Sequence, residues 1–364
     1  MSGQSEFSDK PLFTRTNMNT DMNETRDMDP SDFRGMLLAS PGQFEEGMRL
    51  AEGVRFPDHP GYRSVMISGM GGSALPGNLL RIFIDDLAGR GLLSERISIY
   101  QNRFYSLPWE ARHSLNIFAS YSGNTEETVD AFESAIAEHL PSIGISSGGK
   151  LEEICIREGI PHVKLPVPFP NFQPRVGTGY FFGALYRILM NEGLVPDMTE
   201  EILSGADFLR SRSDAIEAEG KRLAALSEGR IPVVYAGTRY KSVAMVWKIK
   251  FNENAKVPSF WNFFPELNHN EMMGYTLPKG DFQVIMLRDP EDHPKNRKRF
   301  VVTADLLRKK GISVEILDME GKNVFNRVFA SILLADFASY HLALRNGIDP
   351  TPVDMVEELK KRLA

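Results

Sequence analysis

Short apolar runs alternate with longer amphipathic segments along most of this chain. The runs have the length of buried strands, and the segments space their apolar residues as one face of a helix requires. In the first half, the sequence predicts strands at 64–68, 96–100, 116–120, 142–146 and 162–166, and helices near 32–53, 74–87 and 177–190. Such alternation is typical of a parallel, doubly wound α/β sheet, which binds ligands beyond the carboxyl ends of its strands.

The same pattern begins again after a helical run that ends near residue 229. The second half has predicted strands at 231–236, 282–287 and 313–317, and predicted helices at 242–256, 295–310, 324–344 and 355–363. The polar segment 191–198 separates the two halves. We therefore predict an α/β protein of two similar units, residues 31–194 and 195–364, each a mostly parallel sheet flanked by helices.

The first thirty residues are polar and lack the apolar core of a secretory signal, which predicts a mobile or loosely docked extension over 1–30. No later stretch looks long and apolar enough to span a bilayer, so we expect no membrane partner. A net charge of −6 without a dense basic patch argues against nucleic acid. The one cysteine, Cys155, excludes an internal disulfide and fits the cytoplasm; its amphipathic surroundings favour a buried small residue over a nucleophile.

The turn after the third predicted strand gathers four hydroxyl side chains and a glycine. It reads Ser120-Tyr121-Ser122-Gly123-Asn124-Thr125 and leads into a helix. The first amides of a helix lack intrahelical partners and favour an anion, and Ser and Thr hydroxyls can donate to the same oxygens. The turn contains no Lys or Arg, so neutral donors would hold a phosphate that must come and go. The alternative is an ordinary Ser/Thr helix cap.

The turn after the first predicted strand is rich in glycine and reads Gly69-Met-Gly71-Gly72-Ser73-Ala74. It fits the fingerprint of dinucleotide-binding folds, but that site also needs an acidic residue at the end of the next strand, which ends Tyr100-Gln101-Asn102. NAD binding is therefore disfavoured. Both turns fall at the carboxyl edge of one sheet, and their convergence favours a phosphate site.

Two polar segments of the second half contain the candidate acid and base groups. In Asn252-Glu253-Asn254-Ala255-Lys256, Glu253 ends a mostly apolar helix, where partial burial makes a carboxylate a useful proton shuttle. In Pro265-Glu-Leu-Asn-His269-Asn-Glu271, His269 is a second candidate, although a surface histidine is the alternative. One histidine without a cysteine makes a poor metal set, so we expect no metal and no cofactor. Arg175 could stabilise negative charge on a substrate oxygen or make an ordinary surface salt bridge.

These motifs, together with Pro174-Arg175, occur in the same order in the bifunctional phosphoglucose/phosphomannose isomerases, and the chain resembles that family from about residue 35 to its end. The resemblance implies two sugar isomerase (SIS) domains and an aldose–ketose isomerase of glycolysis and gluconeogenesis. It would interconvert fructose 6-phosphate with glucose 6-phosphate and mannose 6-phosphate. Ala74 departs from a third glycine that is common in relatives, but it remains small.

The resemblance also implies roles for individual residues. Gly72, Ser73, Ser120, Ser122 and Thr125 would bind the phosphate of a hexose 6-phosphate. Glu253 would carry a proton between C2 and C1 through a cis-enediolate, and Arg175 would stabilise that enediolate. His269 would assist ring opening from the neighbouring subunit of a homodimer. Lys360 would help it, although the adjacent Lys361 competes for this match.

Two alternatives remain open at this point. A non-catalytic SIS protein that senses a phosphosugar would keep Ser120, Ser122 and Thr125 but would not need Glu253 and His269. An amidotransferase-type SIS isomerase would bring a glutaminase domain with an N-terminal cysteine, which this chain lacks. The balance between the two epimers depends on room around the C2 hydroxyl, which we expect residues 351–360 to limit in part.

Overall fold

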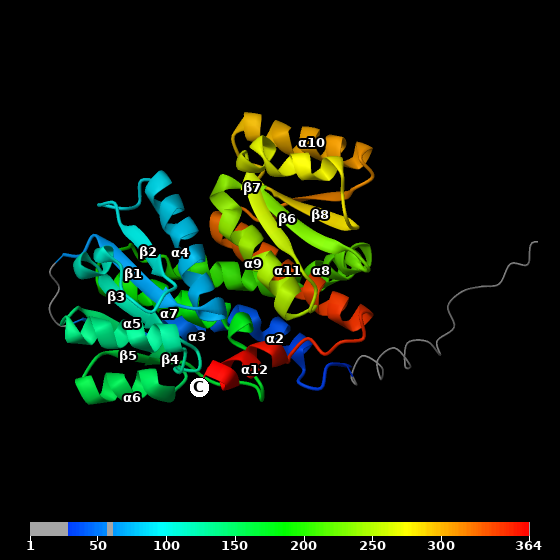
Figure 1. Ribbon diagram of the computed structural model, residues 1–364. Coiled ribbons are helices and arrows are strands. Elements are labelled where there is room, and N and C mark those ends of the chain that lie inside the picture. Colours follow the sequence, from blue (N-terminus) through cyan, green and yellow to red (C-terminus); the bar gives the residue numbers. More distant parts are fainter. Residues whose placement is uncertain (1–27, 57–60, 364) are drawn as a thin grey trace, which may run out of the picture.

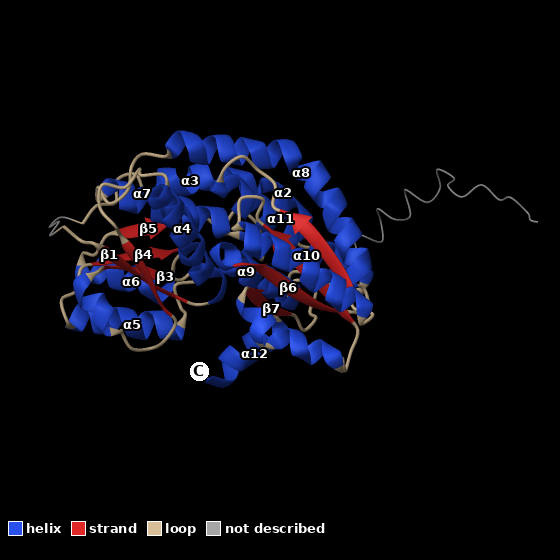
Figure 2. Ribbon diagram, turned by 90° about the horizontal axis from the view of Figure 1, so that it is seen from above, coloured by secondary structure: helices blue, strands red, loops and turns tan. Residues whose placement is uncertain are grey.

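Two parallel sheets organise the computed structural model, which describes residues 28–56 and 61–363 (Figures 1 and 2). The first sheet has the order β2-β1-β3-β4-β5 and the second the order β7-β6-β8-β9. Every pair of neighbouring strands runs parallel. The strands are β1 Ser64–Gly69, β2 Ser98–Asn102, β3 Leu115–Ala119, β4 Ser142–Ser146, β5 His162–Lys164, β6 Ile231–Gly237, β7 Phe260–Phe264, β8 Phe282–Arg288 and β9 Ser313–Asp318. The predicted α/β class is confirmed.

Helices cover the faces of both sheets and fill the space between them (Figure 2). The α-helices are α2 Phe33–Ala39, α3 Gln43–Leu50, α4 Gly71–Gly89, α5 Glu126–Ala137, α6 Gly149–Glu158, α7 Thr178–Asn191, α8 Thr199–Ser227, α9 Lys241–Glu253, α10 Pro294–Lys309, α11 Val324–Arg345 and α12 Asp354–Leu363. Short 3-10 turns are η1 Ser40–Gly42, η2 Trp109–His113, η3 Pro174–Val176, η4 Thr238–Tyr240, η5 Glu266–His269 and η6 Glu271–Thr276.

The structure corrects two of the predicted elements. The single helix expected over 32–53 is interrupted by η1, where Pro41 lacks the amide that would continue the ladder, so α2 and α3 are separate. The strand β7 was not predicted at all. Its sequence Phe-Trp-Asn-Phe-Phe lies at the edge of the second sheet and is only partly buried, so it lacks the clean alternation of a half-buried strand.

The central strands of the first sheet explain where its ligand-binding turns lie. All five residues of β3 and of β4 are buried, as expected for parallel strands covered on both faces. Gly69 of β1 pairs with Ala119 of β3, so both strands end at the same level. Because the strands are parallel, the turns that follow them meet at one edge of the sheet, which we call the first carboxyl edge.

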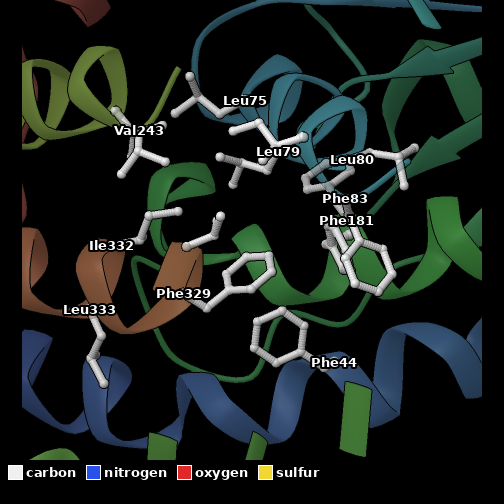
Figure 3. Close-up of a cluster of buried hydrophobic side chains, with 14 of the residues drawn as sticks. Phe44, Leu75, Leu79, Leu80, Phe83, Phe181, Val243, Phe329, Ile332 and Leu333 are labelled. Carbon is white, nitrogen blue, oxygen red and sulfur yellow. The ribbon is translucent and has the colours of Figure 1, made fainter. Parts of the chain in front are cut away.

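One hydrophobic core joins the two halves. In Figure 3 the rings of Phe44, Phe83, Phe181 and Phe329, which come from α3, α4, α7 and α11, gather in one cluster. The ring centroids of Phe44 and Phe329 are 4.6 Å apart in an edge-on arrangement. Burial of this many large apolar side chains, each worth about 1.5–3 kcal/mol, holds the two sheets in a fixed relation.

The helix α11 corrects the expectation about apolar stretches. Its 22 residues have the length and hydropathy of a membrane span, but 83% of its most apolar window is buried inside the protein. Asp336 and Arg327 on this helix are also buried and bonded, so α11 is a core helix. Of the predicted N-terminal extension, residues 1–27 lie outside the described part of the chain. Asp29 is described, and its carboxylate accepts hydrogen bonds from the Phe33 amide and the Tyr340 hydroxyl.

Candidate functional site

The turns after β1 and β3 are joined by a hydrogen bond at the first carboxyl edge. The buried Ser73 hydroxyl, in the first turn of α4, accepts from the Tyr121 amide at 2.9 Å. The α4 N-cap residue, Met70, makes no side-chain capping bond. The glycine-rich and serine-rich turns, predicted to converge, therefore form one continuous surface.

Hydroxyl groups and helix amides point to an anion at this surface. The Ser120 and Thr125 hydroxyl oxygens are 2.8 Å apart, and Ser122 is exposed with its hydroxyl accepting from the Asn124 amide at 3.2 Å. Thr125 is the N-cap of α5 but makes no side-chain capping bond. The first amides of α5 are thus left for another acceptor, which favours an anion site over the alternative of a simple cap.

Two glycines allow the close approaches on which this surface depends. Gly123 has a φ of +71° and lies so near the Gly148 carbonyl that a Cβ could not be accommodated. A Cβ on Gly72 would lie 2.7 Å from the backbone nitrogen of Arg175. The glycine-rich turn is therefore packed directly against η3, which presents Arg175.

Arg175 is buried at the junction of the two halves, where its N–H groups bond to protein acceptors. Its Nε donates to Asn254 Oδ1 at 2.6 Å and its Nη1 to Gln173 Oε1 at 3.1 Å. Its Nη2 donates to the carbonyls of Pro350 and Thr351 at 2.8 and 2.9 Å. Burial, partly offset by nearby carboxylates, lowers the pKa of Arg175, but arginine stays charged in proteins. The surface salt bridge considered from the sequence is excluded, since the side chain is 1% exposed.

Glu253, the last residue of α9, lies beside this arginine. Its Oε2 is 3.6 Å from Arg175 Nη1, and about a third of its side chain is exposed. The next residue, Asn254, is buried and fixed between Arg175 and the Ser339 hydroxyl. The carboxylate of the second half is thereby brought against η3, which in turn contacts the glycine-rich turn of the first half.

A second buried cation, Lys250, stabilises the same junction. Lys250 Nζ donates to the Arg175 carbonyl and lies 2.7 Å from Asp336 Oδ1. Burial of Asp336 raises its pKa, while the lysine favours the ionised form. The pair fixes α9 to α11 and to η3, so the backbone that carries Glu253 is held from two sides.

His269 is not near Glu253 in this chain. It is exposed in η5, which follows β7, whereas Glu253 precedes β7. The Ser259 hydroxyl bonds to the Pro232 carbonyl, which marks the opposite, amino edge of the second sheet. Since β7 has five residues, its ends are about 13 Å apart at about 3.3 Å per residue. The two predicted acid–base residues therefore lie at opposite edges of one sheet.

Within the described part of the chain, Lys360 has no hydrogen bond or ion pair with another predicted site residue, and its role stays a prediction. It is exposed on α12, and its Nζ is 2.7 Å from Glu357 Oε1 of the same helix. None of the described residues of α12, the helix near the C-terminus in Figure 1, is buried. Lys361 is equally exposed, so the geometry does not choose between the two lysines.

Three further residues build the junction, and the sequence did not predict a role for any of them. Asn254 and Lys256 stand in the same motif as Glu253, and that motif was the available signal. Pro350, which offers its carbonyl to Arg175, had no signal in the sequence because its contact is 175 residues away along the chain.

The remaining predicted features can be placed briefly. Cys155 is buried with a pKa raised to about 12 by burial, which confirms the structural interpretation. Within the described ranges, no three His, Cys, Asp or Glu side chains gather as a metal site would require. Glu266 and Glu271, the acidic residues near His269, bond separately to Asn270 and to Tyr235. Metal independence stays a prediction.

Comparison with known proteins gives relatives along most of the chain. The bacterial phospho-glucose isomerase C-terminal SIS domain matches residues 216–363. A bifunctional phosphoglucose/phosphomannose isomerase from Caldicellulosiruptor bescii is 36% identical over 334 residues, covering 88% of this chain and 94% of that protein. One of the same description from Aquifex aeolicus is 32% identical and covers 83% and 91%.

Solved structures share the fold at low identity. A hypothetical protein from Thermus thermophilus superimposes with a TM-score of 0.73 at 15% identity, covering 96% of both chains. The C-terminal domain of glucosamine-fructose-6-phosphate aminotransferase from Francisella tularensis gives 0.64 at 13% identity, covering 88% of this chain and 97% of that domain. At this identity the likeness concerns the fold alone.

Proposed function

Since this chain belongs to the family of bifunctional phosphoglucose/phosphomannose isomerases, we propose that its site interconverts fructose 6-phosphate with glucose 6-phosphate and mannose 6-phosphate. The protein is an isomerase with two SIS-type sheets. We assign residues 31–194 to the unit that binds the phosphate and residues 195–364 to the unit that supplies acid–base groups. We expect it to act in the cytoplasm without a metal or cofactor.

A single observation carries the proposal, and it is the position of Glu253 at the junction. The carboxylate lies 3.6 Å from Arg175, whose backbone packs against Gly72 of the anion-binding surface. A sugar anchored by its phosphate to that surface would extend its other end toward the second half. This supports a carboxylate base acting on carbons remote from the phosphate.

In the proposed mechanism, the neutral donors of the first carboxyl edge bind the phosphate. Ser120, Ser122 and Thr125 would supply hydroxyls, and Gly72 and Ser73 would supply close backbone at the start of α4. Binding energy from this remote group holds the reacting carbons in place, which lowers the barrier to the chemical step. Neutral donors also allow release of the product.

Glu253 would remove the proton from C2 of the aldose and return it to C1 of the ketose. The intermediate is a cis-enediolate, so negative charge develops on the substrate oxygens as the proton leaves. Arg175 supplies a fixed positive charge beside this carboxylate. Four hydrogen bonds to protein acceptors fix its guanidinium in place, and we assign its main effect to the electric field of this charge in a buried site.

Ring opening needs a second acid–base group, which we assign to His269 of a neighbouring subunit in a homodimer. The separation of His269 from Glu253 along β7 supports this assignment, since one chain cannot bring both to the same sugar without rearrangement. Lys360 would assist from α12. In this arrangement the isolated monomer is inactive.

The proposal is tested with purified, chelator-treated protein in coupled assays for both hexose phosphates. We expect activity with both, and we expect Glu253→Gln to lower kcat by about 10²–10⁴-fold while calorimetric binding of fructose 6-phosphate persists. Glu228→Gln, an exposed carboxylate paired with Arg345, is the matched control and should retain activity. Binding without turnover in the wild type would favour a phosphosugar sensor, and full activity in Glu253→Gln would refute the assignment of the base.

A further inference from the structure

Lys256 folds back onto the end of the helix that carries Glu253. Its backbone has a φ of +57°, in the left-handed region that side chains other than glycine and asparagine rarely adopt. From there its Nζ donates to the Glu253 carbonyl, and it donates to the Pro350 carbonyl at 2.9 Å. The side chain is therefore committed to two carbonyls from distant parts of the chain.

Pro350 and Thr351 are the last buried residues before α12. The Pro350 carbonyl accepts from Arg175 as well as from Lys256. The helix that begins three residues later, at Asp354, has no buried residue among those described. Its position relative to Glu253 therefore depends on the attachment at residues 350 and 351, not on packing of its own.

From this geometry we infer that Lys256 is a positioning residue: it fastens Pro350 to the end of α9 and so fixes the start of α12 relative to Glu253. The expected effect of Lys256 on catalysis rests on the proposed function. The attachment of Pro350 to the end of α9 does not, because it can be observed without the reaction. No role in proton transfer is assigned to Lys256.

Lys256 is surrounded by charged groups of both signs. It faces Arg175 of η3, Glu253 of α9, Asp349, which directly precedes Pro350, and Asp354, the first residue of α12. Burial, and then repulsion from Arg175, lower the pKa of Lys256 to about 8. A lowered lysine pKa means that the folded state holds this proton less tightly than the unfolded state. The charged form therefore opposes folding below about pH 8.

The first test compares Lys256→Met with Lys256→Arg, using Lys309→Met on α10 as the matched control. Lys309 is exposed and paired with Asp305. We expect Lys256→Met to lower kcat for fructose 6-phosphate by roughly tenfold to a hundredfold, since small misplacements of catalytic groups have effects of this size. KM should change less, and Lys256→Arg should recover part of kcat. Denaturant titration at pH 7 checks that each variant is folded under the assay conditions, so that a change in kcat with little change in KM reports the position of catalytic groups.

The second test reads the attachment without using activity. A nitroxide is placed at Met355→Cys on α12, where the side chain is 88% exposed, and at Ile156→Cys on α6 as a control. The native Cys155 is buried and should not react. We expect Lys256→Met to sharpen the spectrum at position 355 but not at 156, and Lys256→Arg to reverse the change. Unchanged spectra at 355 would overturn the inference. Sharpened spectra at position 355 with an unchanged kcat would show that the attachment exists but does not affect catalysis. A wild type without isomerase activity would contradict the proposed function, and the spectra would still decide whether Lys256 attaches residue 350.

Discussion

The carboxyl edges of the two sheets have the same topology but opposite chemistry. At the first edge, the turns after β1 and β3 present glycine and hydroxyl groups, with no charged side chain from 69 to 74 or from 120 to 125. At the second edge, the turn after β8 contains Asp289, Glu291 and Asp292. Arg327 pairs with Asp289 at 3.4 Å and with Glu291, and Asp292 lies against Gly237 in the turn after β6.

This difference shows that the fold determines where a ligand can bind, whereas the side chains of the turns determine which ligand binds. An anion at the second edge would meet three carboxylates, of which Arg327 pairs with Asp289 and Glu291, whereas the first edge presents hydroxyl groups and helix amides without a carboxylate. The one arginine in the turn after β6, Arg239, is bonded instead to Asp86 of α4. We therefore expect the second sheet to contribute its amino edge, with Glu253, rather than a second phosphate site.

The largest effect is expected when the first edge is made to resemble the second. Ser122→Asp places a carboxylate among the phosphate donors and keeps an acceptor for the Asn124 amide. Repulsion between like charges at about 4 Å should raise the KM for fructose 6-phosphate roughly 100-fold. The neutral isostere Ser122→Asn controls for shape and should have a much smaller effect. Equal KM values for the two variants would show that no phosphate binds there.

A smaller effect is expected when the two turns of the first edge are uncoupled. Ser73→Ala removes the acceptor of the buried Tyr121 amide, which should lower the free energy of unfolding by about 1–3 kcal/mol. The turn would lose its fixed position, and we expect KM to rise about tenfold. Ser134→Ala, on the exposed face of α5, serves as the control. Denaturant titration measures the free energy of unfolding, and steady-state kinetics measure KM. An unchanged KM would show that the hydrogen bond between Ser73 and Tyr121 does not affect substrate binding.

The smallest effect on activity is expected at the second edge. Glu291→Gln should leave kcat/KM within about twofold of the wild type but lower the free energy of unfolding at pH 7 by about 1 kcal/mol, because Arg327 loses a charged partner. Arg327 lowers the pKa of Glu291. The contribution is therefore present above the ordinary glutamate pKa and is lost as the pH falls through the lowered value. Wild type and variant should converge in stability under acid, and a large loss of activity would contradict the division between the edges.

Much of the fold was predictable because short stretches of sequence determine it. The strands of the first sheet are continuous apolar runs, and their turns contain glycine and serine at fixed places, so β4 was predicted to the residue. The strand β7 was not predicted because its aromatic residues lie at a partly exposed edge of the sheet and do not alternate with polar residues. It also stands between two polar motifs. The helix α9 ends three residues earlier than predicted, since Lys256 turns back in a left-handed conformation that a propensity argument does not anticipate.

The sequence supplied candidate residues for the site but not their geometry. The anion surface follows from two turns at one edge of a sheet, which sequence and topology fix together. The contact of Arg175 with Glu253 joins residues that are far apart in the chain and depends on how the two halves pack. For the same reason the sequence did not indicate that His269 lies at the opposite edge of the sheet from Glu253, or that Asn254 and Pro350 accept hydrogen bonds from Arg175.

The most direct measurement is a crystal structure of the Glu253→Gln variant with fructose 6-phosphate. The account predicts the phosphate within hydrogen-bond distance of Ser120, Ser122 or Thr125, with C1 and C2 next to the side chain at position 253. A phosphate bound at the second edge, or sugar carbons directed away from position 253, would contradict it.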